Sequence, residues 1–322
     1  MSQPRLAAIV IGRNEGERLK CCLQSLAPEH VPTVYVDSNS TDGSQNLARS
    51  MGATVHALAT DRPFTAARAR AEGVAALAGT GAEPEYLFFV DGDCEVEDGW
   101  LERATEFLDA EPGYAAVCGR RRERYPDASP YNRLMDREWD TPVGPAEACG
   151  GDAVYRFSAY RDAGGFNPAM IAGEEPELCT RLRAKHWAIM RLGAPMTIHD
   201  AAMSRFGQWW RRAVRSGIGY AQAWNTTRRS PAGALYARQL SKAILWAGLL
   251  PLTAIALAVL WHPLWLVIWP LATLTQLIRL TLRDGWFTAR LMVAGKYAEL
   301  IGIVRFAGRY LRGRTGGTVL YK

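Results

Sequence analysis

The first 120 residues alternate short apolar runs with stretches of helix-forming composition. Runs rich in β-branched and aromatic side chains predict strands, and their alternation with helices favours an α/β fold with a mostly parallel sheet and helices on both faces. The expected strands cover residues 6–11, 33–36, 53–58, 86–90 and 115–119. Such a sheet binds ligands beyond the carboxyl ends of its strands, so the residues after each run are the first candidates for a functional site.

Charge is distributed unevenly along the chain. Residues 1–200 carry 30 acidic and 21 basic side chains, a net of −9, whereas residues 201–322 carry 17 basic and 2 acidic side chains, a net of +15. The overall charge of +6 would permit a nucleic-acid partner, but the basic segment surrounds an apolar stretch and lacks a recognisable docking motif. We therefore expect anionic membrane lipid, and no nucleic acid, as its partner.

Residues 243–278 form a stretch of 36 residues with no formal charge apart from His262. Residues 244–261 would form a helix about 27 Å long, close to the roughly 30 Å hydrocarbon thickness of a bilayer, and residues 264–278 a shorter one. His262-Pro263 is a natural turn between them. We expect a membrane-associated hairpin with its basic flanks on the cytoplasmic side, and Pro251 and Pro270 favour monotopic insertion over full spanning. A buried hairpin in a soluble protein is the alternative.

One further amphipathic helix is expected at residues 286–312. An apolar stripe recurs there at steps of four and three residues: Val293, Tyr297, Leu300, Val304, Ala307 and Leu311. This stripe would either lie in the lipid headgroup layer or pack onto the catalytic domain or another subunit. We divide the chain into a catalytic domain at residues 1–225 and a C-terminal helical membrane region at residues 226–322.

Acidic residues follow two of the expected strands. Asp37, at the end of the second, is placed to accept a hydrogen bond from a nucleotide base or ribose. Asp91 and Asp93 flank Gly92 after the fourth strand, where two carboxylates offer hard oxygen ligands to Mn²⁺ or Mg²⁺ beside a diphosphate. A solvated turn is the alternative for this second pattern.

Later segments add further candidates. Glu174 and Glu175 precede Pro176 at an expected helix start, where a carboxylate facing a cleft would act as general base, or would only cap the helix. His199 ends a β-like stretch and is either a metal ligand or a structurally satisfied histidine. Residues 208–212, Gln-Trp-Trp-Arg-Arg, place polar groups for phosphate on neighbouring faces of a helix.

Taken in order, these segments resemble the membrane-associated bacterial type of family 2 glycosyltransferase, which has the GT-A nucleotide-sugar-binding fold. The resemblance covers roughly residues 6–225 and rests on several motifs in sequence order. They are the opening at 9–16, Asp37, Asp91-Gly92-Asp93, Gly150-Gly151-Asp152 followed by Arg156, Gly164-Gly165-Phe166, and the run from Glu174-Glu175 to Arg181.

The resemblance implies roles for individual residues. It assigns Glu175 as the base that deprotonates the acceptor hydroxyl, Asp93 as direct metal ligand, and Asp91 to the ribose or the metal. His199 is a further metal candidate from its position alone. The resemblance assigns the nucleotide and its phosphates to Arg13, Glu15, Asp37, Arg68, Gln208, Arg211 and Arg212. Two departures stand out: many relatives have Glu-Asp at 174–175, and Arg212 stands where processive relatives have Trp.

The activity implied is inverting, metal-dependent transfer of a sugar from a nucleoside diphosphate sugar. Asp37 favours a UDP-sugar, and membrane attachment favours a lipid-linked, glycolipid or polysaccharide acceptor at the cytoplasmic membrane face. A sugar-phosphate nucleotidyltransferase is one alternative, although residues 12–16 are a poor version of its phosphate loop. A catalytically silent membrane module that binds a sugar nucleotide is the other.

Overall fold

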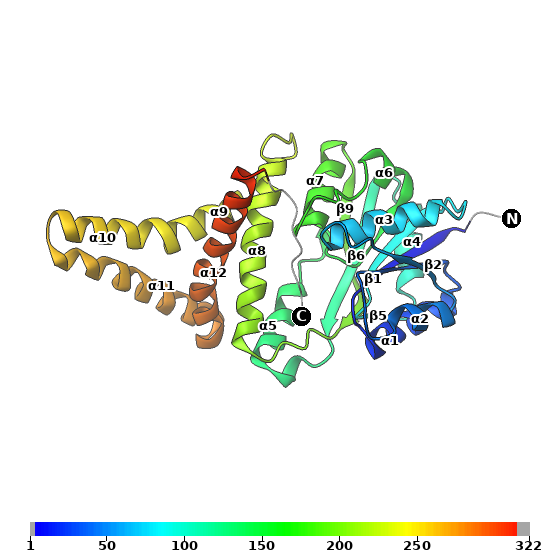
Figure 1. Ribbon diagram of the computed structural model, residues 1–322, viewed down its shortest axis with the longest axis horizontal. Coiled ribbons are helices and arrows are strands. Elements are labelled where there is room, and N and C mark those ends of the chain that lie inside the picture. The colour runs from blue at the N-terminus through cyan, green and yellow to red at the C-terminus, as the bar shows by residue number, and fades with distance from the viewer. Residues whose placement is uncertain (1–3, 314–322) are drawn as a thin grey trace.

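The computed structural model describes residues 4–313, which form an N-terminal part built on a β-sheet and a C-terminal set of helices (Figure 1). The sheet has nine strands in the order β3-β2-β1-β4-β8-β6-β9-β5, with β7 also paired to β9. Their bounds are β1 Leu6–Gly12, β2 Thr33–Asp37, β3 Thr54–Ala57, β4 Tyr86–Asp91, β5 Cys94–Val96, β6 Tyr114–Glu123, β7 Gly144–Pro145, β8 Ala153–Arg156 and β9 Ala188–His199.

The sheet is mixed, which corrects the expectation of a mostly parallel one. Strands β3, β2, β1 and β4 are parallel, as is the pair β6 and β9. Strand β8, however, runs antiparallel to both neighbours, and β5 and β7 run antiparallel to β9. Half of the eight pairings are therefore antiparallel. Strand composition alone does not specify direction, because direction depends on which strands become neighbours.

The strand registers bring the site loops to one edge. Gly12 pairs with Asp37 and Ile11 pairs with Asp91, so β1, β2 and β4 end at the same level. Because β8 is antiparallel, its first residue, Ala153, lies opposite Phe89 near that same edge. The loops after β1 and β2, the Asp91-Gly92-Asp93 turn and the loop before β8 therefore converge.

Helices cover the sheet and complete a core of small, aliphatic and aromatic side chains. Helix α3 packs so closely on β1 and β2 that a Cβ on its Gly73 would overlap side-chain atoms of Ile9 and Val36. The helices of this N-terminal part are α1 Glu17–Leu26, α2 Ser44–Ser50, α3 Ala66–Ala78, α4 Trp100–Ala110, α5 Pro130–Trp139, α6 Phe157–Asp162, α7 Glu174–Ala184 and α8 Phe206–Thr227. Short 3-10 helices lie at Ala27–Glu29 and Pro126–Ala128.

Two long apolar helices form a hairpin that projects from the rest of the molecule (Figure 1). The first runs from α9 (Ala237–Ala243) through a π-helical segment, Ile244–Leu249, into α10 (Leu250–Leu260). The second joins a 3-10 turn, Pro263–Val267, to α11 (Ile268–Asp284). At 24 and 22 residues, both are long and apolar enough to cross a membrane. The turn at His262-Pro263 agrees with the prediction, but the second limb is longer than expected because the helix continues past Arg279.

The hairpin is not a buried core element among residues 4–313. Only 17% and 6% of the most apolar 18-residue windows of its two limbs are buried. Large apolar side chains near its tip are exposed, including Val259 at 79% and Leu264 at 70%. This exposure disfavours the alternative of a hairpin buried in a soluble protein, since so many large exposed apolar groups are unusual in one.

Helix α12 (Trp286–Leu311) lies between the hairpin and α8 (Figure 1). Its contact with α8 uses small residues: a Cβ on Gly302 would overlap the carbonyl oxygen of Val214. The apolar stripe expected from the sequence lies on another face, where Tyr297 accepts a hydrogen bond from Trp269 of α11 at 3.0 Å. The stripe therefore packs on the hairpin at its start and is exposed at Val304 and Leu311 near its end.

Candidate active site

Hydrogen bonds connect the loop after β1 to the loop after β2. The backbone N–H of Asn14 donates to Ser40 Oγ at 2.9 Å, and Asn14 Oδ1 accepts from the N–H of Thr41 at 2.7 Å. One carboxylate oxygen of Asp42 accepts from the N–H of Gly16 at 3.0 Å, and the other from the Ser44 hydroxyl at 2.6 Å. These bonds give both loops one fixed shape at the carboxyl edge.

Asp37 is completely buried below these loops. Its carboxylate accepts from the Tyr35 hydroxyl at 3.1 Å and from the Ser40 N–H and the Gln45 amide at 2.9 Å each. Burial, followed by the nearby charge of Asp37, raises the pKa of Tyr35 far above its usual range. These hydrogen bonds hold the Asp37 carboxylate in one position, and its backbone is held at the end of β2.

The other candidates near these loops lie as follows. The Arg13 guanidinium lies 5.7 Å from the ring centre of Phe64. Glu15 pairs with Arg18 at 2.7 Å. Arg68 is buried in α3, where it pairs with Glu72 at 2.7 Å, and its Nη2 has no hydrogen-bond partner within residues 4–313. A buried guanidinium with an unused donor is suited to receive an anionic ligand group.

The carboxylate of Asp91 forms ion pairs with two arginines, one at each oxygen. Its Oδ1 lies 2.8 Å from Arg70 and its Oδ2 lies 3.0 Å from Arg121. Burial opposes ionisation of this carboxyl group, but the charges of Arg70 and Arg121 outweigh it and lower the pKa of Asp91. The Asp91 carboxylate is therefore ionised and held in place.

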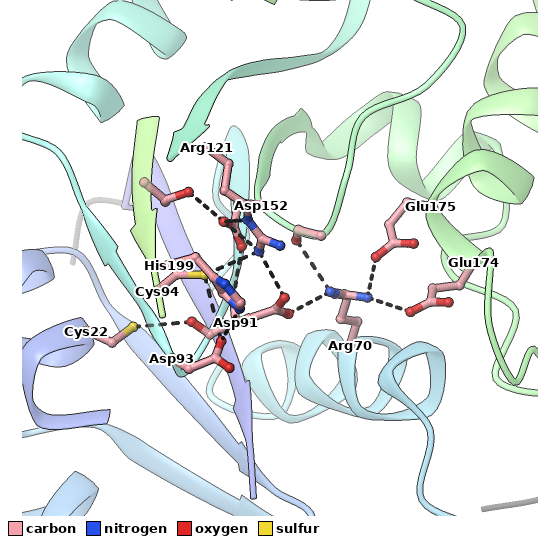
Figure 2. Close-up of polar contacts among 12 residues, drawn as sticks. Cys22, Arg70, Asp91, Asp93, Cys94, Arg121, Asp152, Glu174, Glu175 and His199 are labelled. Atoms are coloured by element: carbon pink, nitrogen blue, oxygen red, sulfur yellow. Dashed lines mark hydrogen bonds and ion pairs between the residues drawn. The ribbon is translucent and has the colours of Figure 1, made fainter. Parts of the chain in front are cut away.

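Arg70 connects Asp91 to the expected base, as Figure 2 shows. Its Nη1 lies 2.8 Å from Glu174 and 2.9 Å from Glu175, while its Nη2 reaches Asp91. The Arg70 side chain is only 2% exposed, so these ion pairs are formed in a medium of low polarity. One buried guanidinium thus fixes the positions of three carboxylates from two separate segments.

The carboxyl group of Glu175 has a pKa near neutrality. Burial raises the pKa of Glu175 to about 7, and repulsion by Glu174 adds to the shift against the attraction of Arg70. Arg215 of α8 is a second cation near these carboxylates. Burial lowers the pKa of Arg215 to about 10, and the negative charges of Glu174 and Glu175 oppose this lowering. A carboxylate with a pKa near 7 is well matched to proton abstraction at physiological pH.

Asp93 and His199 lie together on the other side of Asp91. His199 Nε2 is 3.4 Å from Asp93 Oδ1, and ligand atoms of Asp93, Cys94 and His199 lie within 4.8 Å of one another. Burial disfavours the charged form of Asp93, but attraction by His199 outweighs it and lowers the pKa of Asp93 well below its usual range. An ionised carboxylate beside an imidazole nitrogen fits Mn²⁺. The ring of Trp139 packs edge-on against His199, with centroids 4.8 Å apart.

Three site residues were not predicted from the sequence: Arg70, Arg121 and Arg215. A fourth, Asp152, belongs to a motif found in the sequence but was given no role. Asp152 accepts from the Asp91 N–H at 3.1 Å and the Thr197 hydroxyl at 2.7 Å, and pairs with Arg121 at 2.8 Å. It reaches the site because β8 enters antiparallel beside β4. Arg121 is one of five consecutive residues with four arginines, and only strand alternation decides which side chain faces inward.

The three candidates at the start of α8 are separated by the structure. The Gln208 side-chain oxygen accepts from the N–H groups of Ser204 and Arg205 at 2.9 Å each, so it caps the helix. Arg212 pairs with Glu138 of α5 at 2.9 Å, and Arg211 is exposed. A phosphate could accept only from the Gln208 Nε2 group, which already donates to the carbonyl oxygen of Ala202 at 3.2 Å.

Comparison with known proteins identifies a glycosyltransferase domain in the N-terminal half of the chain. Residues 7–163 match the sequence model described as Glycosyl transferase family 2. Glycosyltransferase AglE of Haloferax volcanii is 24% identical over 240 residues, covering 70% of this chain and 76% of that protein.

Two solved structures are similar to the whole described chain. The mannosyltransferase PcManGT from Pyrobaculum calidifontis, in complex with GDP-Man and Mn²⁺, matches with a TM-score of 0.60 at 19% identity, covering 95% of this chain and 88% of that one. TarS residues 1–349 from S. aureus match with a TM-score of 0.52 at 15% identity, covering 96% and 92%. The chain is therefore a glycosyltransferase that carries a family 2 domain with the GT-A fold.

Proposed function

We propose that the chain transfers a sugar from a nucleoside diphosphate sugar to a hydroxyl of a membrane-anchored acceptor, with inversion at the anomeric carbon. The observation that carries this proposal is the bridge from Asp91 through Arg70 to Glu175. It holds an ionised carboxylate for the donor and a base with a pKa of about 7 in one rigid constellation. Preorganised groups of this kind lower the barrier because they need no rearrangement during reaction.

The donor occupies the carboxyl edge of the sheet. Arg13, Glu15, Asp37 and Arg68 surround the nucleotide, and Asp91 faces the ribose. A UDP-sugar is the first candidate, and GDP-mannose is the second because PcManGT was solved with GDP-Man. Asp93 and His199, with Asp91 at longer range, would hold Mn²⁺ or Mg²⁺, which as a Lewis acid would stabilise charge on the diphosphate.

The chemical step is a single displacement. One carboxylate oxygen of Glu175 takes the proton of the acceptor hydroxyl as that oxygen attacks the anomeric carbon. The bond from the anomeric carbon to the diphosphate oxygen breaks, and the electron pair leaves with the nucleoside diphosphate. Arg211, and Arg212 after release from Glu138, stabilise the leaving group's charge. Because the attack comes from the face opposite the leaving group, the configuration inverts.

Residues 226–322 attach the catalytic domain, residues 1–225, to the cytoplasmic face of the membrane. Three observations support this division: the exposed apolar hairpin, the positive charges at its base and the packing of α12 across that base. The acceptor is accordingly a lipid-linked sugar, a glycolipid or a nascent polysaccharide held at the membrane face. Anionic lipid would bind the cations around the hairpin.

A donor and acceptor screen tests the proposal. Full-length protein in membrane lipid extract is incubated with Mn²⁺ and each labelled sugar nucleotide, UDP-sugars and GDP-mannose included. We expect release of nucleoside diphosphate together with a labelled, extractable product of inverted anomeric configuration. A product of retained configuration, or wild-type turnover by both Glu175→Gln and Asp93→Asn, would overturn the mechanism.

A further inference from the structure

A cleft separates α5 of the catalytic domain from the corner between α11 and α12. Its volume is about 250 Å³. Arg133, Leu134 and Arg137 line it from α5, and Trp286 and Phe287 line it from the start of α12. The cleft therefore combines one wall with two arginines and a leucine with a second wall that carries two aromatic rings.

The cationic wall is poorly neutralised. Arg133 and Arg137 are four residues apart on one helix, so they face the same way, and both are exposed. Arg133 pairs with Asp127, a carboxylate that is 88% exposed and thus well screened. Arg137 forms no ion pair within residues 4–313. The acidic residue of the opposite wall, Asp284, is already paired with Arg283 at 2.6 Å.

The cleft lies at the base of the apolar hairpin. Asp284 is the last residue of the second limb, and Trp286 begins the next helix. Trp286 is 54% exposed, and the Arg290 guanidinium lies 5.5 Å from its ring centre and 5.4 Å from that of Phe287. Tryptophan and arginine at the end of a membrane-inserted helix are typical of the headgroup layer. If the hairpin is inserted, the cleft opens at headgroup depth.

Helix α5 lines the cleft and also contacts His199, which we propose binds the metal together with Asp93. Helix α5 ends at Trp139, which packs on His199 and lies 5.5 Å from the Arg121 guanidinium. Arg137 and Arg133 lie about 3 Å and about 9 Å before Trp139 along the helix axis. Both arginines point away from the side of α5 on which Trp139 packs against His199, so a molecule bound at them must pass around the helix to approach the site.

We propose that this cleft binds the phosphate group of the membrane-anchored acceptor lipid, so that the acceptor is held at the membrane side of the catalytic domain. The proposal rests on the proposed function and names the acceptor's anionic group. Paired guanidinium groups bind phosphate oxygens through charge-assisted hydrogen bonds, and the apolar wall covers the first part of the lipid chain. A lipid headgroup and other phosphate esters offer the same anionic group to the arginines. Because the opposite wall is apolar, we propose that the bound phosphate belongs to a lipid.

Native mass spectrometry of the full chain in detergent tests the proposal. The probes are dioleoyl phosphatidic acid, dioleoyl phosphatidylcholine and inorganic phosphate. Wild-type protein should retain phosphatidic acid in preference to both others. Arg133→Gln with Arg137→Gln should lower that retention by about tenfold or more. Arg238→Gln with Arg279→Gln, which removes the same charge from the hairpin flanks, is the matched control and should retain the lipid.

The outcomes separate this site from its alternatives. Equal loss in both double variants would mean general attraction to positive charge and would overturn the proposal, as would equal retention of inorganic phosphate.

In transfer assays with membrane lipid extract, the cleft variant should show a raised KM for acceptor, with unchanged donor binding and flotation with vesicles. Absence of any transfer by wild-type protein would instead refute the proposed function, since lipid retention is measured without turnover.

Discussion

Gly217 in α8 and Glu299 in α12 touch through their backbones: a Cβ on Gly217 would overlap the carbonyl oxygen of Glu299. Arg215, two residues earlier on α8, faces the opposite side and interacts with Glu174 and Glu175. One face of α8 thus lines the catalytic site, and the opposite face packs against α12 of the C-terminal helices. The position of the active site relative to the hairpin depends on this close helix packing.

Adding a methyl group at this contact should loosen it. Gly217→Ala and Gly302→Ala each place a Cβ against a backbone carbonyl, so the helices must separate, at a cost of about 1–3 kcal/mol or more. Thermal unfolding in detergent should show a lower Tm for both variants. Gly308→Ala is the matched control on α12, because its Cβ would meet no atom within 4 Å. An unchanged Tm for Gly302→Ala would contradict the observed packing.

The activity should follow the ionisation of Glu175. The base must be unprotonated, and its pKa is raised by burial to about 7, so kcat/KM should fall about tenfold per pH unit below pH 7 and level off above it. Glu175→Gln should lower kcat by about 10² to 10⁴ and abolish this acid limb. Steady-state rates between pH 5 and 9 measure both effects.

The same ionisation should affect stability in the opposite direction. The folded-state pKa of Glu175 lies above its ordinary value of 4.5, so the folded protein binds the proton more tightly than the unfolded chain. Wild-type stability is therefore lost as the pH rises from about 4.5 through 7. Glu175→Gln does not ionise, so its Tm relative to wild type should rise between pH 5 and pH 8. A difference independent of pH would show that Glu175 titrates normally.

Removal of Arg70 should be severe because three carboxylates lose their shared partner. Arg70→Met removes the cation that Asp91, Glu174 and Glu175 share, and breaking such buried pairs costs about 3–5 kcal/mol. Arg121 remains paired with Asp91, and Arg215 remains near the two glutamates. Arg70→Lys retains the charge but cannot reach all three groups, so folding should survive while the acid limb of the pH profile moves upward. Arg49→Ala, on the exposed surface of α2, is the control and should change the Tm little.

Metal affinity should depend on Asp93 and His199 together. Asp93→Asn and His199→Gln should each weaken Mn²⁺ binding by about 10- to 100-fold, measured by calorimetry or electron paramagnetic resonance. Asp98→Asn removes an exposed acid from the loop after β5 and should leave Mn²⁺ affinity unchanged. Equal weakening by all three variants would indicate attraction by general negative charge.

Membrane attachment should be sensitive to charge near the hairpin tip. Val259 is 79% exposed, so Val259→Asp should fold normally in detergent, but the carboxylate would oppose insertion by about 2–3 kcal/mol. Vesicle flotation should show reduced binding. Val143→Asp changes another exposed valine, at 66%, in the catalytic domain and should float like wild type. Full flotation by Val259→Asp would place the hairpin tip outside the membrane.

The sequence by itself determined the fold class, the carboxyl-edge position of Asp37, Asp91 and Asp93, and the hairpin with its turn at His262-Pro263. These features depend on local patterns: apolar runs, the residues that follow them and the absence of charge. Asp93 and His199 were proposed from positions 106 residues apart, and β5 and β9 bring them to within 3.4 Å. The roles of the individual site residues remain predictions to be tested by the experiments above.

Only the tertiary structure decided how the site is held together. Arg70, Arg121 and Asp152 enter it because α3 packs on β1 and because β8 runs antiparallel to β4, and neither arrangement is encoded in a local pattern. The same holds for α12, whose apolar stripe is the more conspicuous face in the sequence, although Gly295 and Gly302 on another face make the contact with α8. Burial, ion pairing and close helix packing arise between segments distant in sequence, and they exist only once the chain has folded.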